Sequence, residues 1–225
     1  MKKLLSTLAL AILPAATCSA VTYAIDIDTQ RIGTTDTSST INTATGFFSM
    51  DATTDSAAAN VTVGGVNFSL GSTPGPNNSR NRGAVNSLTD LTRDFVFEDG
   101  PNAAIIMFLG GAGSLAAGTW QIEVWSSDNT ANPIDPVLVG LRVDTPGPGT
   151  AVDLITPISF TGSQTAPFVT TFVSDGVSAY DVFIREANIN DRARLNAVRL
   201  TSIPEPASAA LLVGSIGAFL LRHRR

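Results

Sequence analysis

Apolar and polar residues alternate with a period of two along most of the chain between residues 21 and 202. Clusters of Gly, Pro, Asn and Asp interrupt this alternation at short intervals. The pattern predicts short strands joined by turns, as in a two-layer β-sandwich or a barrel. The expected strands cover residues 23–27, 46–52, 61–70, 95–97, 103–109, 120–125, 137–143, 152–160, 168–173, 179–185 and 195–201.

Three segments refine this picture. Gly64 and Gly65 interrupt the segment 61–70, where a two-residue hairpin or a glycine bulge both fit. Residues 87–93 predict a helical turn, and the continuous apolar run at 103–109 predicts a buried central strand. No long amphipathic helix is expected, so the fold class is all-β.

The segment 120–125 contains both tryptophans of the chain. Alternation turns Trp120 toward the core and places Trp125 on the more polar face. Sugar rings stack on exposed aromatic faces, so Trp125 is the predicted ligand-binding residue. The alternative is that Trp125 covers a sheet edge or packs beneath a loop.

Residues 1–20 have the pattern of a secretory signal peptide. Two lysines precede an apolar run of about ten residues, and small residues stand before the predicted cleavage site between Ala20 and Val21. Two alternatives are a membrane anchor, for which the run is short, and a lipoprotein signal that uses Cys18.

The last residues combine three features in a fixed order. Pro204, Glu205 and Pro206 come first, an apolar stretch at 208–221 follows, and a basic group at 222–225 ends the chain. The apolar stretch is short for a membrane span, but arginines that snorkel bring it close to the required length. The basic group predicts that this end stays cytoplasmic.

These features closely resemble the PEP-CTERM sorting signal of Gram-negative bacteria. The resemblance implies that a membrane exosortase recognises Pro204, Glu205 and Pro206, that cleavage occurs nearby, and that the protein is released to the surface or the extracellular polymer matrix. The alternative is a plain C-terminal transmembrane helix that anchors the protein.

The charged residues between the two ends exclude much chemistry. Residues 21–206 contain no Lys, His or Cys, and nine arginines oppose 19 acids, which gives a net charge of −10. A Ser-His-Asp triad, a cysteine nucleophile, a Schiff-base lysine, a histidine-ligated zinc and a P-loop lysine are therefore impossible there. The negative charge also disfavours nucleic acid as a partner.

Carboxylates remain as candidate chemical groups. Asp26 and Asp28 alternate to one face of the first strand, and Asp128 follows the segment that holds Trp125. Calcium prefers oxygen ligands, so these three aspartates are candidate ligands of a structural calcium ion. A pair of carboxylates across a cleft would instead suit a glycosidase.

Several short motifs in the middle of the chain resemble galactose-binding-like and malectin-like sandwiches. They lie at residues 25–27, 91–95, 115–122 and 195–200. The resemblance implies a jelly-roll-like antiparallel β-sandwich with a capacity for sugar binding.

Together these features predict a signal peptide at 1–20, a β-sandwich domain at 21–202 and a sorting signal at 203–225. We expect a chain exported by the Sec pathway, held transiently at the inner membrane, and then placed at the surface or outside the cell. The expected partners are an exosortase, the membrane and polysaccharide, and the domain is expected to be non-enzymatic. The alternative is a secreted glycan hydrolase that uses carboxylates.

Overall fold

A computed structural model describes residues 19–32, 37–38, 41, 43–53, 58–73, 78–81, 90–98, 104–128, 136–144, 151–162, 166–188 and 192–205. Most of the predicted signal peptide and the sorting signal from Pro206 onward lie outside the described residues. Residues 21–203 form one compact unit. Within the described ranges, no helix is long and apolar enough to cross a membrane.

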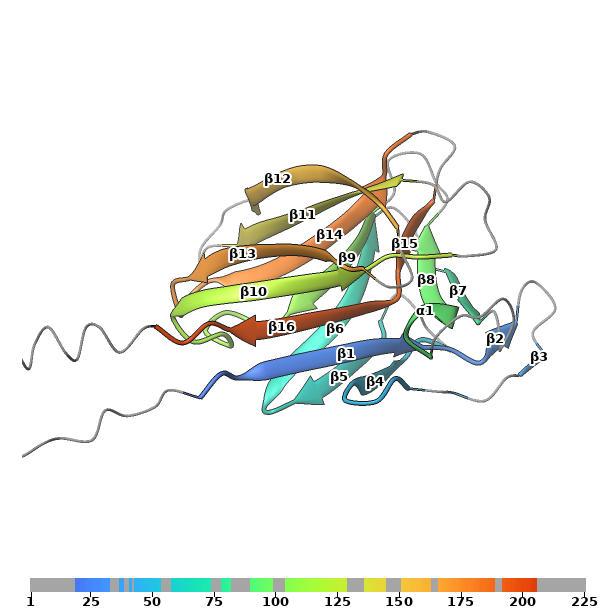
Figure 1. The fold of residues 1–225 in the computed structure, drawn as a ribbon, viewed down its shortest axis with the longest axis horizontal. Coiled ribbons are helices and arrows are strands. Elements are labelled where there is room, and N and C mark those ends of the chain that lie inside the picture. The colour runs from blue at the N-terminus through green and yellow to red at the C-terminus, as the bar shows by residue number, and fades with distance from the viewer. Residues whose placement is uncertain are drawn as a thin grey trace, which may run out of the picture. The chain divides into compact units, whose positions relative to one another are not determined.

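Two sheets face each other in this unit (Figure 1). The five-stranded sheet has the order β13-β10-β16-β1-β4. Its strands are β1 (Thr22–Asp28), β4 (Phe48–Asp51), β10 (Gly118–Trp125), β13 (Phe168–Ser174) and β16 (Ala197–Ser202).

The six-stranded sheet has the order β12-β11-β14-β9-β6-β5. Its strands are β5 (Asn60–Val63), β6 (Val66–Thr73), β9 (Ala104–Leu109), β11 (Pro136–Asp144), β12 (Val152–Thr161) and β14 (Ala179–Glu186). The all-β sandwich that the alternating pattern predicts is therefore confirmed.

Smaller elements gather at one end of the unit (Figure 1). A three-stranded sheet has the order β15-β8-β7, and a short pair joins β2 to β3. Their bounds are β2 (Arg31–Ile32), β3 (Thr37–Ser38), β7 (Asn78–Asn81), β8 (Asp94–Glu98) and β15 (Ala193–Leu195), with the single helical turn α1 (Asp90–Arg93) before β8.

The hydrophobic core lies between the two large sheets. Tyr23 of β1 meets Phe68 of β6 with ring centroids 5.5 Å apart, and Phe172 of β13 meets Tyr180 of β14 at 5.2 Å. Burial follows the predicted alternation, because Trp120 is only 3% exposed. Between β5 and β6, Gly64 and Gly65 both have positive φ and form the two-residue hairpin turn.

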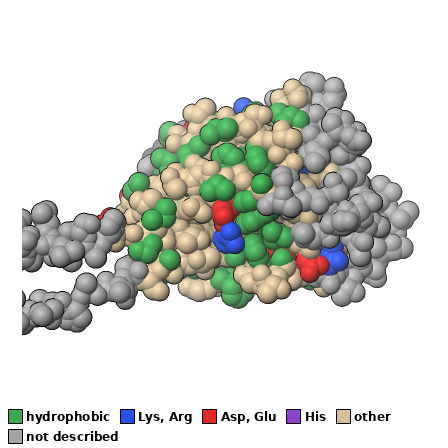
Figure 2. Space-filling model, viewed as in Figure 1, with side chains coloured by type: hydrophobic (Ala, Val, Ile, Leu, Met, Phe, Trp, Pro, Cys, Tyr) green, Lys and Arg blue, Asp and Glu red, His purple; other side chains and the backbone are tan. Residues whose placement is uncertain are grey.

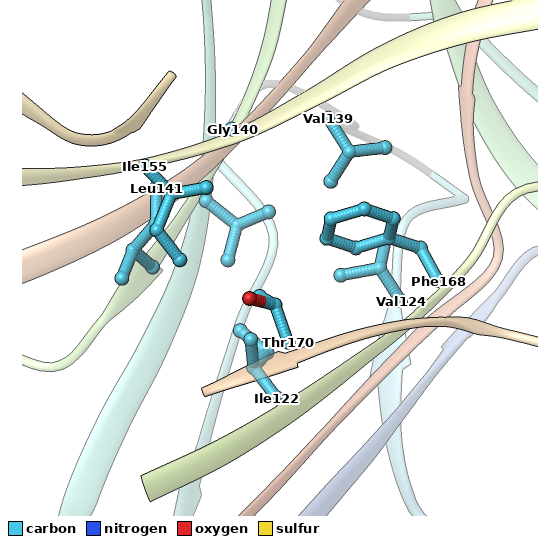
Figure 3. A pocket seen from close by; sticks show the side chains of 9 residues that line it. Ile122, Val124, Val139, Gly140, Leu141, Ile155, Phe168 and Thr170 are labelled. Carbon is cyan, nitrogen blue, oxygen red and sulfur yellow. The ribbon is translucent and has the colours of Figure 1, made fainter. Parts of the chain in front are cut away.

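One part of the interior is loosely packed (Figure 3). Its lining is apolar except for the Thr170 hydroxyl, and it has no space for a water molecule. The lining comes from both sheets: Ile122, Val124, Val139, Gly140, Leu141, Ile155, Phe168, Thr170 and Val182. This region is a dry packing gap and not a ligand site.

Some features differ from the expectations. The sandwich is not wholly antiparallel, because β1 pairs with β4 in parallel. The strands β2, β3 and β7 come from polar segments that lack the alternation used for prediction. The segment 195–201 is divided at Asn196, where the chain passes from the three-stranded sheet to the five-stranded sheet.

The two ends of the compact unit are joined by hydrogen bonds. The Val21 N–H donates to Ser202 Oγ at 2.7 Å, and the Ser202 N–H donates to the Val21 carbonyl at 2.8 Å. The Ile203 N–H donates to the Thr119 carbonyl at 2.8 Å. The chain therefore enters and leaves the sandwich at the same end (Figure 1). Ala20 and the first two residues of the predicted sorting motif are exposed.

Candidate functional site

The predicted ligand-binding residue, Trp125, lies at the end of β10 on the outer face of the five-stranded sheet. It is only 6% exposed, so the expectation of an exposed ring is wrong. Phe47 packs edge-on against it with ring centroids 5.6 Å apart, and the Arg199 guanidinium lies 5.3 Å from its ring centre. The alternation correctly places Trp125 on the outer face. The segment that contains Phe47, distant in the sequence, covers its ring.

An ion pair lies beside Trp125 on the same face. Arg199 Nε donates a hydrogen bond to Glu123 Oε2, and this bond raises the pKa of Arg199. Figure 2 shows an acidic and a basic side chain together in the middle of this face, amid hydrophobic and uncharged groups. Because each charge already has a partner, this face offers no unpaired charge at Arg199 or Glu123.

Two predicted calcium ligands, Asp26 and Asp28, lie side by side on β1 and are fully buried. The Ala44 N–H donates to Asp26 Oδ2 and Thr43 Oγ1 donates to Asp28 Oδ2, each at 2.7 Å. The second oxygen of each carboxylate accepts no hydrogen bond. Burial of an unpaired carboxylate is costly, and a bound cation would offset this cost. The two free oxygens therefore suit binding to a cation such as calcium.

Burial also perturbs the titration of this region. Desolvation raises the pKa of Asp26 to about 7, and the nearby charge of Asp28 acts in the same direction. Desolvation raises the pKa of Asp94, at the start of β8, to about 8, again with help from Asp28. Both groups therefore hold their protons up to nearly neutral pH.

The third predicted ligand, Asp128, has a different partner. It lies 3.8 Å from Arg194 Nε, and both side chains are buried. The described ranges contain no group of three or more carboxylate, His or Cys side chains that could hold a metal ion. The predicted three-aspartate site is therefore absent there, and calcium would depend on Asp26, Asp28 and backbone oxygens.

The region between these acids and Trp125 is fixed by Asn196. Its Nδ2 donates to the carbonyls of Thr92 and Asp94, at 3.1 and 2.8 Å. Its Oδ1 accepts the Ser127 N–H at 2.6 Å. Asn196 thus joins the small sheet to the end of the five-stranded sheet, which is a structural role.

A groove on the outer face of the six-stranded sheet has a different character. It is shallow and open to solvent, with a volume of about 520 Å³. The residues that line it are small, polar or aromatic: Asn60, Asn67, Ser69, Phe108, Gly110, Gly111 and Ala179.

Strand pairing aligns the main groups of this groove. Asn60 lies opposite Ser69, Ser69 lies opposite Phe108, and Phe108 lies opposite Asp181. Directly opposite residues share one face of a sheet, so these four side chains form a row across β5, β6, β9 and β14. The row presents an amide, a hydroxyl, an aromatic ring and a carboxylate in succession.

The aromatic member of the row is exposed. Phe108 has 40% of its surface open to solvent, which is unusual for a phenylalanine in the middle of a sheet. Its ring lies close to the backbone of Gly71, where a Cβ would come within 2.8 Å of Phe108 Cε2. Glycine at this position therefore lets the ring lie close to the sheet.

The row ends in an ion pair. Arg142 Nε donates to Asp181 Oδ1 at 2.8 Å, and the Arg142 guanidinium also lies 5.0 Å from the Phe183 ring centre. Burial raises the pKa of Asp181, while the hydrogen bond and the charge of Arg142 oppose this shift. The pair continues the row beyond the residues that line the groove.

This arrangement suits recognition of a sugar. The exposed ring can stack on the apolar C–H face of a pyranose, and amide and hydroxyl groups can bond its hydroxyls. The sequence did not reveal the groove, because Phe108 stands in a continuous apolar run that predicts a buried strand. Only the register between β6 and β9 shows which side of that run faces outward.

The sequence matches no family model, and no curated protein matches it. Several solved structures similar to this chain are carbohydrate-binding modules. TmCBM61, solved in complex with β-1,4-galactotriose, has a TM-score of 0.38 and 13% identity over 60% of this chain and 88% of that chain. The xylan-binding module CBM15 has a TM-score of 0.37 and 9% identity over 65% of this chain and 97% of that chain.

The enzymatically active domain of bacteriophage CBA120 tailspike protein 4 is also similar. It has a TM-score of 0.38 and 14% identity over 59% of this chain. The match spans only 19% of the length of that tailspike chain.

Proposed function

We propose that this chain is an exported, non-enzymatic β-sandwich protein that binds polysaccharide at the cell surface or in the extracellular matrix. The groove over Phe108 is the observation that carries the binding part of the proposal. It combines an exposed aromatic ring with the amides of Asn60 and Asn67 and the hydroxyl of Ser69.

The location in this proposal rests on the sequence of the two ends. Pro204, Glu205 and Pro206, followed by an apolar stretch and arginines, resemble the PEP-CTERM signal, and the first 20 residues resemble a signal peptide. An exosortase and, transiently, the inner membrane are the partners that these ends imply. The exposed positions of Pro204 and Glu205 suit recognition by an enzyme.

The competing proposal is a secreted hydrolase that uses two carboxylates. Such an enzyme needs both groups in an open cleft, several ångströms apart. Asp26, Asp28 and Asp94 are close enough to interact, but all three are fully buried. Asp181 is only 5% exposed, and Arg142 holds it in an ion pair. Non-catalytic binding therefore has the stronger support.

Binding is tested with the processed protein on immobilised polysaccharides and on a glycan array. Phe108→Ala should weaken binding to the best ligand about tenfold, which is the loss expected for one stacking contact of about 1.4 kcal/mol. Phe48→Ala is the matched control, because Phe48 is 52% exposed on β4 of the other sheet. Cleavage of a glycan that stops after a single Asp→Asn change would establish the hydrolase instead.

Sorting is tested separately in the native host. Glu205→Ala, or deletion of residues 207–225, should change where the protein accumulates. Cell fractionation gives the location, and mass spectrometry of the C-terminus gives the processing site. An intact C-terminus on the mature surface protein would contradict the proposed processing.

A further inference from the structure

The end of the sandwich where the chain enters and leaves carries a group of exposed aliphatic side chains. Val21 is 45% exposed, Val173 66%, Val177 58% and Ile203 40%. We call these four residues the terminal surface. Figure 2 shows hydrophobic side chains among uncharged groups at this end of the unit. Isolated exposed aliphatic residues are common, but four around both chain ends form a group.

Hydrogen bonds bring the four residues together from distant parts of the sequence. Val21 pairs with Ser202, beside Ile203, and Ile203 in turn bonds to Thr119. Thr119 lies opposite Val173 across β10 and β13. The terminal surface is therefore a fixed feature of the paired strands β1, β16, β10 and β13.

The fourth residue, Val177, is held outward by a rigid turn between β13 and β14. Asp175 Oδ1 accepts the N–H groups of Val177 and Ser178, each at 2.8 Å, and Asp175 Oδ2 accepts Ser178 Oγ at 2.7 Å. The Asp175 carboxylate is thus bonded within its own turn. Two further acids, Asp144 and Asp153, lie on β11 and β12 near this end, since Asp144 is opposite Ala179.

Chain length fixes how far this end can lie from the predicted membrane segment. Among the described residues, Ile203 is the last that hydrogen-bonds to the sandwich, and Pro204, Glu205 and Pro206 separate it from Ala207. The four Cα–Cα steps from Ile203 to Ala207 span at most about 14 Å. The polar layer of one leaflet is itself about 5–8 Å thick. If the proposed membrane segment starts near Ala207, this link leaves less than about 10 Å between the end of the sandwich and the outer edge of the head groups.

From this reach and from the exposed aliphatic residues, we propose that the terminal surface rests on the membrane that holds the C-terminal segment. Val21, Val173, Val177 and Ile203 contact the interfacial layer of the lipid until processing releases the chain. The inference rests on the proposed sorting signal, and it adds a defined orientation. The strands stand away from the bilayer, and the end that carries β7, β8 and β15 points outward.

The test uses the full chain with Cys18→Ser, which removes its single cysteine, reconstituted in phosphatidylcholine–phosphatidylglycerol vesicles. One new cysteine is placed at Val177 or Val173 and labelled with an environment-sensitive fluorophore. The control label is at Thr161, which is exposed and lies opposite Pro136 at the far end of β11. Because the eight residues of β10 span the sandwich, the two ends are about 25 Å apart.

Lipids with brominated acyl chains should quench the labels at Val177 and Val173 at least threefold more than the label at Thr161. Equal quenching at all three positions, in chains that float with the vesicles, would contradict the proposed orientation. It would not contradict the proposed sorting signal. A chain that does not float with the vesicles would overturn the membrane segment, and this inference with it. Polysaccharide binding by the same preparations is independent of both outcomes.

Discussion

The ring of Phe108 lies so close to Gly71 that a Cβ at Gly71 would come within 2.8 Å of Phe108 Cε2. Gly71→Ala should therefore push the ring outward from the sheet. The ring is exposed and can move, so we expect only a small loss of stability. The stacking geometry changes, and the affinity for polysaccharide should fall several-fold, as measured by calorimetry.

A double-mutant cycle gives the control for this prediction. If Gly71→Ala acts through the ring, it should have no further effect on affinity in a Phe108→Ala background. Additive losses in the double variant would show that Gly71 affects binding by another route.

The buried acids give the stability of the protein a defined dependence on pH. The pKa of an unfolded aspartate is near 3.8, while burial raises that of Asp26 to about 7 and that of Asp94 to about 8. Between these values the folded state binds more protons than the unfolded state. The free energy of unfolding should therefore fall by a few kcal/mol as the pH rises from 4 to 8.

Chemical denaturation in EDTA across this pH range measures the effect. Asp94→Asn should reduce the slope, because the substituted side chain has no proton to lose and only Asp26 still titrates. Asp153→Asn, at an exposed position, is the control and should keep the slope of the parent protein. A parent profile that is flat from pH 4 to 8 would contradict the assignment.

Calcium should stabilise the fold through the same region, whereas a rise in pH destabilises it. Asp26 and Asp28 each have one carboxylate oxygen without a hydrogen-bond partner. If they bind calcium with backbone oxygens, millimolar calcium should raise the melting temperature at pH 8, and Asp28→Asn should abolish the shift. Equal melting temperatures in calcium and in EDTA would exclude this site.

The strands of the two large sheets were predictable from sequence, but the positions of the functional groups were only partly predictable. Alternation identified the buried face of β10 correctly, because local periodicity determines which side a residue faces. In β1 both faces are buried, because Asp26 and Asp28 are covered as fully as Ile25 and Ile27. Alternation could not show that Phe47 and Arg199 cover Trp125, since those contacts come from distant segments. The same limit hid Phe108, whose outward side depends on the register between β6 and β9.

Packing on the outer face of the six-stranded sheet predicts a sensitive glycine. A Cβ at Gly140 would come within 2.5 Å of Phe183 Cε1 and 3.1 Å of the Ile155 carbonyl oxygen. Although Gly140 borders the packing gap of Figure 3, its own Cβ direction is blocked. Gly140→Ala should destabilise the fold by about 1–3 kcal/mol in denaturant melts. Gly111→Ala is the control, because the nearest atom to its Cβ is 4.0 Å away.

The last strand should decide whether the domain folds at all. β16 lies between β10 and β1 in the middle of the five-stranded sheet, and Val198 and Leu200 on it are fully buried. A chain that ends after Ile203 keeps every one of these contacts and should melt at the temperature of the processed protein. A chain that ends after Asn196 loses the strand and exposes the edges of β1 and β10, so it should show no cooperative transition. Thermal unfolding followed by circular dichroism compares the two. A cooperative transition in the shorter chain would mean that the sandwich does not depend on β16, and that folding can finish before the C-terminal strand is in place.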